Sequence, residues 1–167
     1  VIADSKKAVA LAGVMGGENS EIKDDTKTVV FESACFMGSS VRVSAKSQGM
    51  RTESSGRFEK GLDPENCMPA LDRACELVNM LGAGEVVCGT IDEYPGKKDT
   101  TVLDFECERY NEFLGTDISA EKMTEILLSL GFGISEGKIT VPSWRADCGC
   151  MNDIAEEVVR IYGYNTI

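Results

Sequence analysis

Two groups of side chains in this sequence of 167 residues have the chemistry of a binding or catalytic site, and both rely on carboxylates. The first is Glu32, which closes the apolar run Val29-Val30-Phe31. A carboxylate at the end of a strand-like run lies either on the solvent-exposed face or in a pocket, where burial requires a hydrogen-bond donor. A hydroxyl group on a ligand could be that donor. The sequence contains no His, so it offers no imidazole as a general base.

The second group is a set of four carboxylates near the C-terminal end: Asp147, Asp153, Glu156 and Glu157. Hard oxygen ligands of this kind suit Mg²⁺. The start of a helix explains the same residues without a metal, because Asp153 as N-cap with Glu156 three residues later forms a capping box. In that interpretation Glu157 adds negative charge near the positive end of the helix. The residues alone leave both interpretations open.

Glycine and hydroxyl residues dominate two further segments. The turn Gly13-Val14-Met15-Gly16-Gly17-Glu18 follows a β-rich run, but it lacks the lysine and the spacing of a P-loop and does not fit the dinucleotide fingerprint. Its paired glycines instead allow positive φ or a close approach of another group. The polar stretch from Gly49 to Pro64 places small hydroxyl residues between alternating charges, which predicts a solvent-exposed loop.

The seven cysteines are odd in number and scattered, so we expect reduced and mostly buried thiols in a cytoplasmic protein. The only close pair, Cys148-Gly149-Cys150, does not have the spacing of a structural zinc site. No apolar run approaches the roughly 20 residues of a membrane helix, and no secretion signal is present. We therefore expect no membrane partner.

The formal net charge of -11 argues against an autonomous nucleic-acid binder, because phosphate contacts need clustered Lys and Arg. The charge is uneven, however. Five basic residues and two acidic residues lie between Arg42 and Lys60, so this stretch is locally positive. An ordinary solvated face explains these charges as well as RNA binding does. The candidate RNA contacts are Arg42, Lys46, Arg51 and Arg57.

The elements that position these groups fall on either side of a change in composition at Tyr94-Pro95-Gly96-Lys97-Lys98-Asp99. Pro-Gly followed by charged residues is typical of a boundary, so residues 1–95 and 96–167 are predicted to form separate domains. The first residues, Val1-Ile2-Ala3-Asp4, look like a strand and lack an initiator Met. We therefore expect that the natural chain begins further upstream.

Upstream of the boundary, β-rich runs predict strands at Lys7 to Val14, Thr28 to Phe31 and Glu85 to Ile91. Apolar residues at helical spacing predict a helix from near Pro64 to Gly82. Downstream, the predicted elements are a strand from Thr101 to Phe105, a helix from Ser119 to Gly131, a strand from Lys138 to Val141 and a helix from Asp153 to Tyr162. The predicted fold class is α+β, a mixed α and β first domain followed by a small winged-helix-like domain, the latter by analogy.

Several segments share an order and spacing with a known family: Val1 to Asp4, the Gly13 to Gly17 turn, Val29 to Phe36, and Met50-Arg51-Thr52 through Asp63-Pro64. Together they resemble the editing domain of the bacterial phenylalanyl-tRNA synthetase β subunit. Downstream, Val141-Pro142-Ser143-Trp144-Arg145-Ala146-Asp147 and the segment from Asp153 to Asn165 resemble the domain that follows editing in the same subunit. Two signatures in the right order cover nearly the whole chain.

This resemblance implies hydrolysis of tyrosine wrongly attached to phenylalanine tRNA, a second sieve for a substrate that merely adds a hydroxyl. By similarity, Glu32 accepts the phenolic hydroxyl, the backbone of Gly16 lines the pocket and Thr52 forms part of its wall. Ser54 stands where many relatives carry Ala, so its hydroxyl narrows the pocket. The general base is not identified, since the pocket histidine of the family would lie upstream of Val1. Backbone groups and the tRNA itself are the alternative means of positioning water.

The resemblance also assigns Asp147, Asp153, Glu156 and Glu157 to a magnesium site shared with the α subunit. The implied partners are that α subunit and tRNA(Phe), and ATP is used by the α subunit rather than bound here. With part of the editing domain missing, we expect the isolated chain to be inactive or weakly active. The alternative function is a non-catalytic module that binds RNA or docks the partner subunit.

Overall fold

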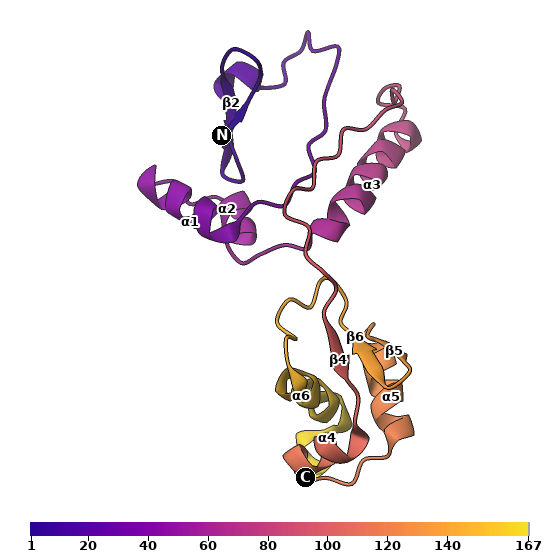
Figure 1. Ribbon diagram of the computed structural model, residues 1–167. Helices are drawn as coiled ribbons and strands as arrows, with labels where there is room; N and C mark the ends of the chain where they lie inside the picture. Colours follow the sequence, from indigo (N-terminus) through magenta and orange to yellow (C-terminus); the bar gives the residue numbers. More distant parts are fainter. Residues whose placement is uncertain (167) are drawn as a thin grey trace. The chain divides into compact units, whose positions relative to one another are not determined.

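The computed structural model describes residues 1–166 and divides into two compact units, Val1–Thr90 and Ile91–Ile167 (Figure 1). Each unit combines helices with one small antiparallel sheet of three strands. The predicted α+β class is therefore confirmed. The winged-helix likeness of the second unit stays a prediction.

The sheet of the first unit has the strand order β1-β2-β3, built from β1 (Ile2–Ala3), β2 (Ala8–Leu11) and β3 (Met15–Gly16). The Asp4 carboxylate accepts hydrogen bonds from the backbone amides of Lys6 and Lys7, which closes the turn after β1. Gly13 lies in the turn after β2 with a φ of 69°. A Cβ at this position would lie 3.0 Å from the Val41 side chain, so both conformation and space favour glycine.

Three helices follow the sheet: α1 (Gly38–Ser47), α2 (Glu53–Phe58) and α3 (Cys67–Met80), with short 3-10 turns at Glu18–Ser20 and Pro64–Asn66. The core of this unit is small. Its buried residues are Val14, Val41 and Ala45, and Leu11, Phe36, Met50 and Phe58 pack against them. No residue of α3 is fully buried, so this helix adds little to that core.

Two strands predicted in the first unit are wrong, because residues 28–31 and 85–91 form no strand. Val30 is 89% exposed and Val87 is 84% exposed. β propensity reflects the fit of a side chain to a pleated, half-buried surface, and neither segment has a neighbouring strand among the described residues. The predicted loop from Gly49 to Pro64 is also partly wrong, because it contains α2.

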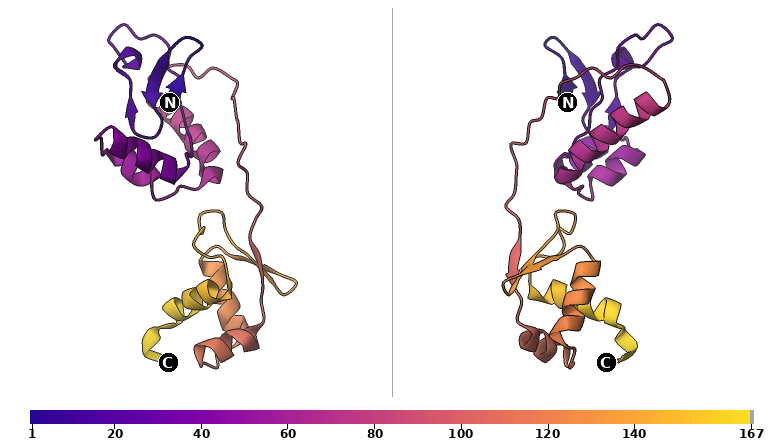
Figure 2. Two further views of the ribbon diagram at one scale, coloured as in Figure 1. Left: turned by 60° about the vertical axis from the view of Figure 1, so that its left-hand side comes forward. Right: turned by 90° about the vertical axis from the view of Figure 1, so that its right-hand side faces the viewer.

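The second unit is built around a larger hydrophobic core. Figure 2 shows the ribbon of its helices and strands from two further sides. Its sheet has the order β4-β6-β5, with β4 (Val102–Asp104), β5 (Gly133–Ser135) and β6 (Lys138–Thr140), and its helices are α4 (Cys107–Leu114), α5 (Ala120–Ser129) and α6 (Met151–Tyr162), followed by a 3-10 turn at Tyr164–Thr166. The predicted strands and the α5 helix are confirmed, whereas α4 was not predicted. Fully buried side chains from all three helices meet the sheet residue Ile139, among them Tyr110, Met123 and Ile154.

Asn111 fastens the connection between α4 and α5. Its amide nitrogen donates to the Ile118 carbonyl at 2.8 Å, and its amide oxygen accepts from the Ile118 amide and the Thr116 hydroxyl, both at 2.8 Å. One partly buried side chain thus forms hydrogen bonds with the amide and the carbonyl of Ile118, which lie outside any helix or strand. This arrangement carries Ile118 into the core.

The start of α6 differs from the prediction. Cys150, not Asp153, is the N-cap, and Asp153 occupies the third helical position of a capping box. The Asp153 carboxylate accepts from the backbone amides of Gly149 at 2.8 Å and Cys150 at 2.9 Å. The helix therefore begins at Met151, two residues earlier than predicted, because a carboxylate at this third position satisfies exposed amides as well as one at the cap does.

A cluster of four charged residues, which we call the arginine cluster, joins α6 to the preceding loop: Arg145, Asp147, Glu157 and Arg160. Glu157 accepts from Arg145 and from Arg160, each at 2.6 Å, and its side chain is only 9% exposed. Arg145 also pairs with Asp147 at 2.7 Å. The hydrogen bonds from Arg160 and Arg145 lower the pKa of Glu157 to about 2. A buried charge with two cationic partners is compensated rather than costly.

No disulfide joins the seven cysteines within the described residues. The expectation that most of them are buried was wrong. Only Cys148 is fully buried, whereas Cys88 and Cys150 are exposed. Burial raises the pKa of the Cys148 thiol to about 11, so this thiol is inert at neutral pH.

We expect the substitution Asn111→Ala to lower the free energy of unfolding of the second unit by about 2 kcal/mol, because it leaves the Ile118 amide unpaired and the Ile118 carbonyl with only the weak thiol donor of Cys107 at 3.4 Å. Asn111→Asp keeps the shape but loses the donor to the Ile118 carbonyl, so it should also destabilise. The control Asn152→Ala changes an exposed side chain on α6 and should have an effect within about 0.5 kcal/mol. Urea unfolding monitored by circular dichroism measures all three; equal stability of Asn111→Ala and Asn152→Ala would contradict the role of Asn111.

We also expect the stability of the second unit to depend on acid through Glu157. The pKa of Glu157 in the folded state is about 2, below its usual value of 4.5. Its contribution is therefore complete above about pH 5 and is lost as the pH falls towards 2, amounting to roughly 3 kcal/mol. Thermal unfolding between pH 7 and pH 2.5 measures this loss, and Glu157→Gln should flatten the curve in this window. A variant curve parallel to that of the wild type would refute the assignment.

Candidate functional site

A hollow of about 470 Å³ lies in the first unit between the β1–β3 sheet and the start of α2. Four of its lining residues are those that the family resemblance assigned to the editing pocket: Gly16, Glu32, Thr52 and Ser54. They come from three separate segments of the chain, which the fold brings to one cavity. Their roles in a reaction stay predictions.

The base of the hollow is apolar and aromatic. Phe36 and Phe58 both line it, and their ring centroids lie 5.1 Å apart with the planes tilted by 48°. Leu11 and Val14 contribute aliphatic surface. A cavity with such walls suits an apolar or aromatic ligand group with a few polar atoms at its rim. The two phenylalanines were not singled out from the sequence, because their pairing depends on contacts between residues 22 positions apart.

Two hydroxyl groups at the start of α2 hold the glycine turn in place. Thr52 Oγ1 donates to the Val14 carbonyl at 2.8 Å, and Ser54 Oγ donates to the Gly13 carbonyl at 3.0 Å. Thr52 Oγ1 also accepts from the Ser55 amide at 3.0 Å, and Ser55 Oγ accepts in turn from the Thr52 amide at 2.9 Å. This capping box fixes the helix end, so the wall of the hollow and the helix cap are one structure.

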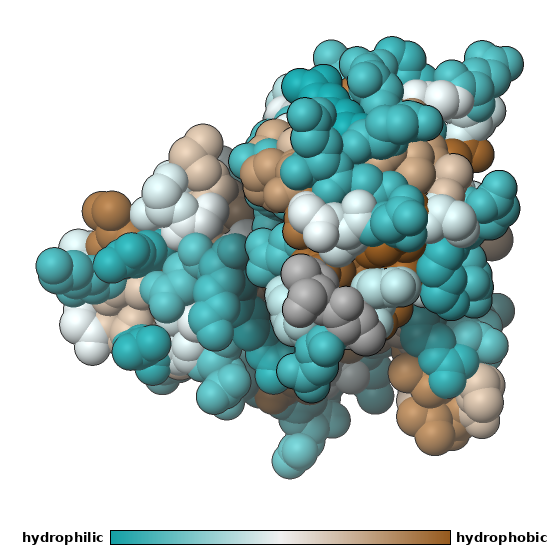
Figure 3. Space-filling view, turned by 90° about the horizontal axis from the view of Figure 1, so that it is seen from below, coloured by the Kyte–Doolittle hydropathy of each residue, from teal (hydrophilic) through white to brown (hydrophobic). Residues whose placement is uncertain are grey.

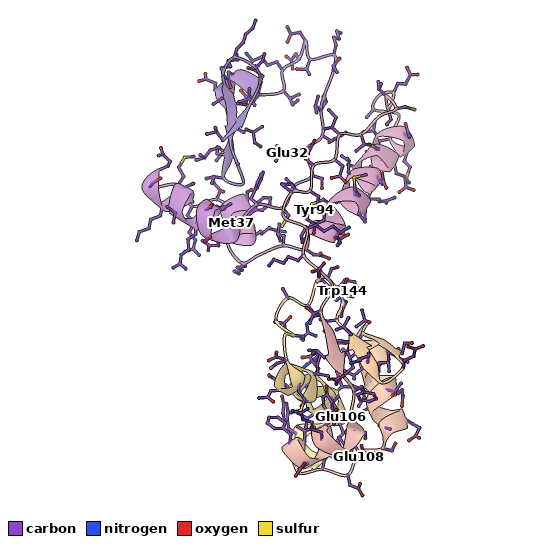
Figure 4. The ribbon with its side chains drawn as sticks, viewed as in Figure 1. Glu32, Met37, Tyr94, Glu106, Glu108 and Trp144 are labelled. Atoms are coloured by element: carbon purple, nitrogen blue, oxygen red, sulfur yellow. The ribbon has the colours of Figure 1, made fainter. Side chains whose placement is uncertain are left out.

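Glu32 is the one acidic side chain of the hollow that the family resemblance singled out, and Figure 4 labels it. Partial burial raises the pKa of the Glu32 carboxyl above its usual range. Within residues 1–166 its carboxylate forms no hydrogen bond and no ion pair. The side chain is nevertheless exposed, so water hydrates the carboxylate in the unbound protein and a donor on a ligand can take the place of that water. Glu53 also lines the hollow, but it pairs with Arg57 at 3.8 Å.

The four candidate RNA contacts lie on or between α1 and α2 and do not line the hollow. Arg42 and Lys46 are exposed, one helical turn apart on α1, and neither forms an ion pair in the described part of the chain. Arg51 pairs with Glu59 at 3.8 Å, and Arg57 with Glu53. The exposed face of α1 therefore carries the least compensated positive charge of this stretch.

The four carboxylates of the predicted magnesium site are not brought together as ligands. Asp147 and Glu157 belong to the arginine cluster, and Asp153 accepts from backbone amides. Glu156 is exposed. Among the described residues, no group of three or more His, Cys, Asp or Glu side chains has an arrangement able to hold a metal ion. As arranged, these residues do not fit Mg²⁺, and a magnesium site here stays a prediction.

No helix within residues 1–166 is long and apolar enough to cross a membrane. On the face drawn in Figure 3, hydrophilic residues cover most of the surface and apolar residues lie between them.

Each of the two units matches a known domain family. Residues 1–83 match the B3/4 domain, and residues 103–164 match the tRNA synthetase B5 domain. The phenylalanine–tRNA ligase beta subunit of Clostridium tetani is 51% identical over 170 residues, which is 99% of this chain and 22% of that protein. The corresponding subunits of Clostridium acetobutylicum and Bacillus subtilis are 46% and 41% identical over 171 residues, 100% of this chain and 22% and 21% of theirs.

The chain thus spans about a fifth of the length of these relatives. The matched stretch covers both units, and the B3/4 match precedes the B5 match along the chain. The chain belongs to the phenylalanine–tRNA ligase beta subunit family and corresponds to a fragment of that subunit.

Proposed function

We propose that the hollow of the first unit forms part of a site that hydrolyses tyrosine wrongly attached to phenylalanine tRNA in the complete ligase. The observation that carries the proposal is Glu32, a carboxylate without a partner in the described chain at the edge of an aromatic hollow. Tyrosine differs from phenylalanine by one hydroxyl, which is a hydrogen-bond donor of the kind this carboxylate lacks. Phenylalanine would leave Glu32 unmatched.

Different lining residues of the hollow would bind different parts of the tyrosine side chain. The apolar surface of Phe36 and Phe58 accommodates an aromatic ring, and Glu32 accepts from the phenolic hydroxyl. Such a site rejects the ligand without the hydroxyl much better than an apolar pocket rejects the ligand with it. The backbone of Gly16 gives close access, because a Cβ at this residue would meet nothing within 4 Å and the strand leaves the hollow open there.

Hydrolysis joins a water oxygen to the carbonyl carbon of the ester and breaks its bond to the ribose oxygen of the tRNA. The chain has no His to take the water proton. The hydroxyls of Thr52 and Ser54 donate to backbone carbonyls, so their role is to shape the wall. We assign the positioning of water to backbone groups and to the tRNA itself.

The same proposal places the chain in an assembly with the α subunit and tRNA(Phe), with ATP used by the α subunit. Arg42 and Lys46 would contact phosphates of the tRNA, because their charges are not compensated by acidic neighbours in the described chain. Arg51 and Arg57 would take part only after exchanging their weak surface pairs with Glu59 and Glu53 for phosphate.

We expect Glu32→Ala in the complete β subunit, assembled with the α subunit, to slow deacylation of tyrosyl-tRNA(Phe) about 10- to 100-fold. A hydrogen bond to a charged group contributes roughly 1.5–3 kcal/mol, and about 1.4 kcal/mol corresponds to a factor of ten. Single-turnover release of labelled tyrosine measures the rate. Phenylalanyl-tRNA(Phe) should remain intact with both enzymes.

The matched control is Glu21→Ala, which removes an exposed carboxylate that does not line the hollow and should leave the rate unchanged. If Glu32→Ala deacylates tyrosyl-tRNA(Phe) at the wild-type rate, the proposed role of Glu32 is wrong.

We expect Thr52→Ala to loosen the wall of the hollow, because it removes both the helix cap and the bond to the Val14 carbonyl. Loss of such a cap costs about 1 kcal/mol, so amide hydrogen exchange in residues 14–16 and 52–56 should become several-fold faster. Thr52→Ser retains the hydroxyl and should exchange like the wild type. Equal protection in all three proteins would show that the hydroxyl does not hold the turn.

A further inference from the structure

The loop between β6 and α6 presents the only tryptophan of the sequence, Trp144. Trp144 is 61% exposed, yet its ring lies against Gly131 so closely that a Cβ on Gly131 would be 2.9 Å from Trp144 Cζ2. The next residue, Arg145, turns inward, and its guanidinium carbon lies 5.8 Å from the centroid of the buried Phe132 ring. An exposed indole is thus followed directly by a largely buried cation.

Arg145 bridges two of the four carboxylates of the predicted magnesium site. Its Nη1 lies 2.6 Å from Glu157 Oε2, and its Nη2 lies 2.7 Å from Asp147 Oδ2. A further bond of 2.9 Å joins its Nε to the other oxygen of Asp147, so this pair is bidentate. The planar guanidinium keeps its charge at all relevant pH values. Glu157 has a second cationic partner in Arg160.

The other two carboxylates differ from this pair. Asp153 accepts from the amides of Gly149 and Cys150 and completes the cap of α6. Glu156, beside Glu157 in sequence, is exposed and has no hydrogen bond or ion pair within residues 1–166. Three of the four side chains therefore have full structural roles that need no metal.

An ion that used Asp147 and Glu157 as ligands would lie a few ångströms from the Arg145 charge, and like charges at that distance repel strongly in a partly buried site. We propose that the Arg145 guanidinium occupies the place between these carboxylates that a metal ion would take, so that the four carboxylates do not bind Mg²⁺. The arginine cluster instead holds the Trp144 loop against α6. Arg145 is thus a positioning residue for Trp144.

The single tryptophan provides the test in the 167-residue chain. Trp144 fluorescence, its quenching by acrylamide and the thermal unfolding midpoint are measured during titration with MgCl2, with NaCl at the same ionic strength as reference. We expect the two salts to give the same three readings up to about 10 mM MgCl2. This concentration is about ten times the millimolar dissociation constants of weak divalent-cation sites in proteins. A shift seen with MgCl2 alone, and lost in Asp153→Asn, would overturn the proposal.

Two neighbouring variants separate the interpretations. Glu157→Gln removes the shared partner of both arginines, so Trp144 should become more accessible to acrylamide and the midpoint should fall by about 5 °C or more. Glu156→Gln should change neither reading. A magnesium site that uses both glutamates predicts instead that the two variants lose Mg²⁺ dependence alike, and that result would also overturn the proposal.

Asp147→Asn keeps the experiment decisive if Glu157→Gln does not fold. Its side chain is 67% exposed, so the substitution removes one partner of Arg145 without leaving a buried group unpaired. We expect a smaller increase in Trp144 quenching, with no difference between MgCl2 and NaCl. Unchanged quenching would show that Arg145 does not position the loop.

Discussion

The pocket of the first unit depends on two hydrogen bonds from the start of α2 to the turn between β2 and β3. Thr52 and Ser54 donate to the consecutive carbonyls of Val14 and Gly13, and the buried core of this unit contains only three residues. With so little apolar burial, polar contacts of high sequence separation hold the sheet against the helices. The hollow keeps its shape because these two hydrogen bonds hold the glycine turn beside the start of α2.

The second unit is organised in another way. Its core gathers buried residues from three helices and a sheet, and polar groups complete it at two places, Asn111 and the arginine cluster. Both satisfy backbone or charged groups that would otherwise be costly inside the protein. The family match to a B5 domain therefore falls on a unit with a continuous hydrophobic core of its own.

Periodic patterns in the sequence predicted β4, β6 and α5 of the second unit, where α5 begins at the Ser119 cap and ends before Gly131, but they missed α4 and β5. They failed at residues 28–31 and 85–91, because a β-rich pattern requires a neighbouring strand that the described chain does not supply. The composition of the polar loop concealed α2, whose cap depends on the reciprocal bonds of Thr52 and Ser55. The acidic segment concealed the role of Arg145, since its pairing with Glu157 across twelve residues leaves no periodic trace.

Glu32 has no partner among the described residues. It therefore lines the hollow without also stabilising the fold, whereas most pocket residues do both. Thr52 shapes the wall and caps a helix, so any change there alters folding as well as the cavity. Glu32 contributes no internal contact of that kind. Its replacement carries little penalty for folding, and its charge is even slightly disfavoured by its surroundings. A change of residue at this position can therefore alter the lining of the hollow almost independently of the stability of the fold.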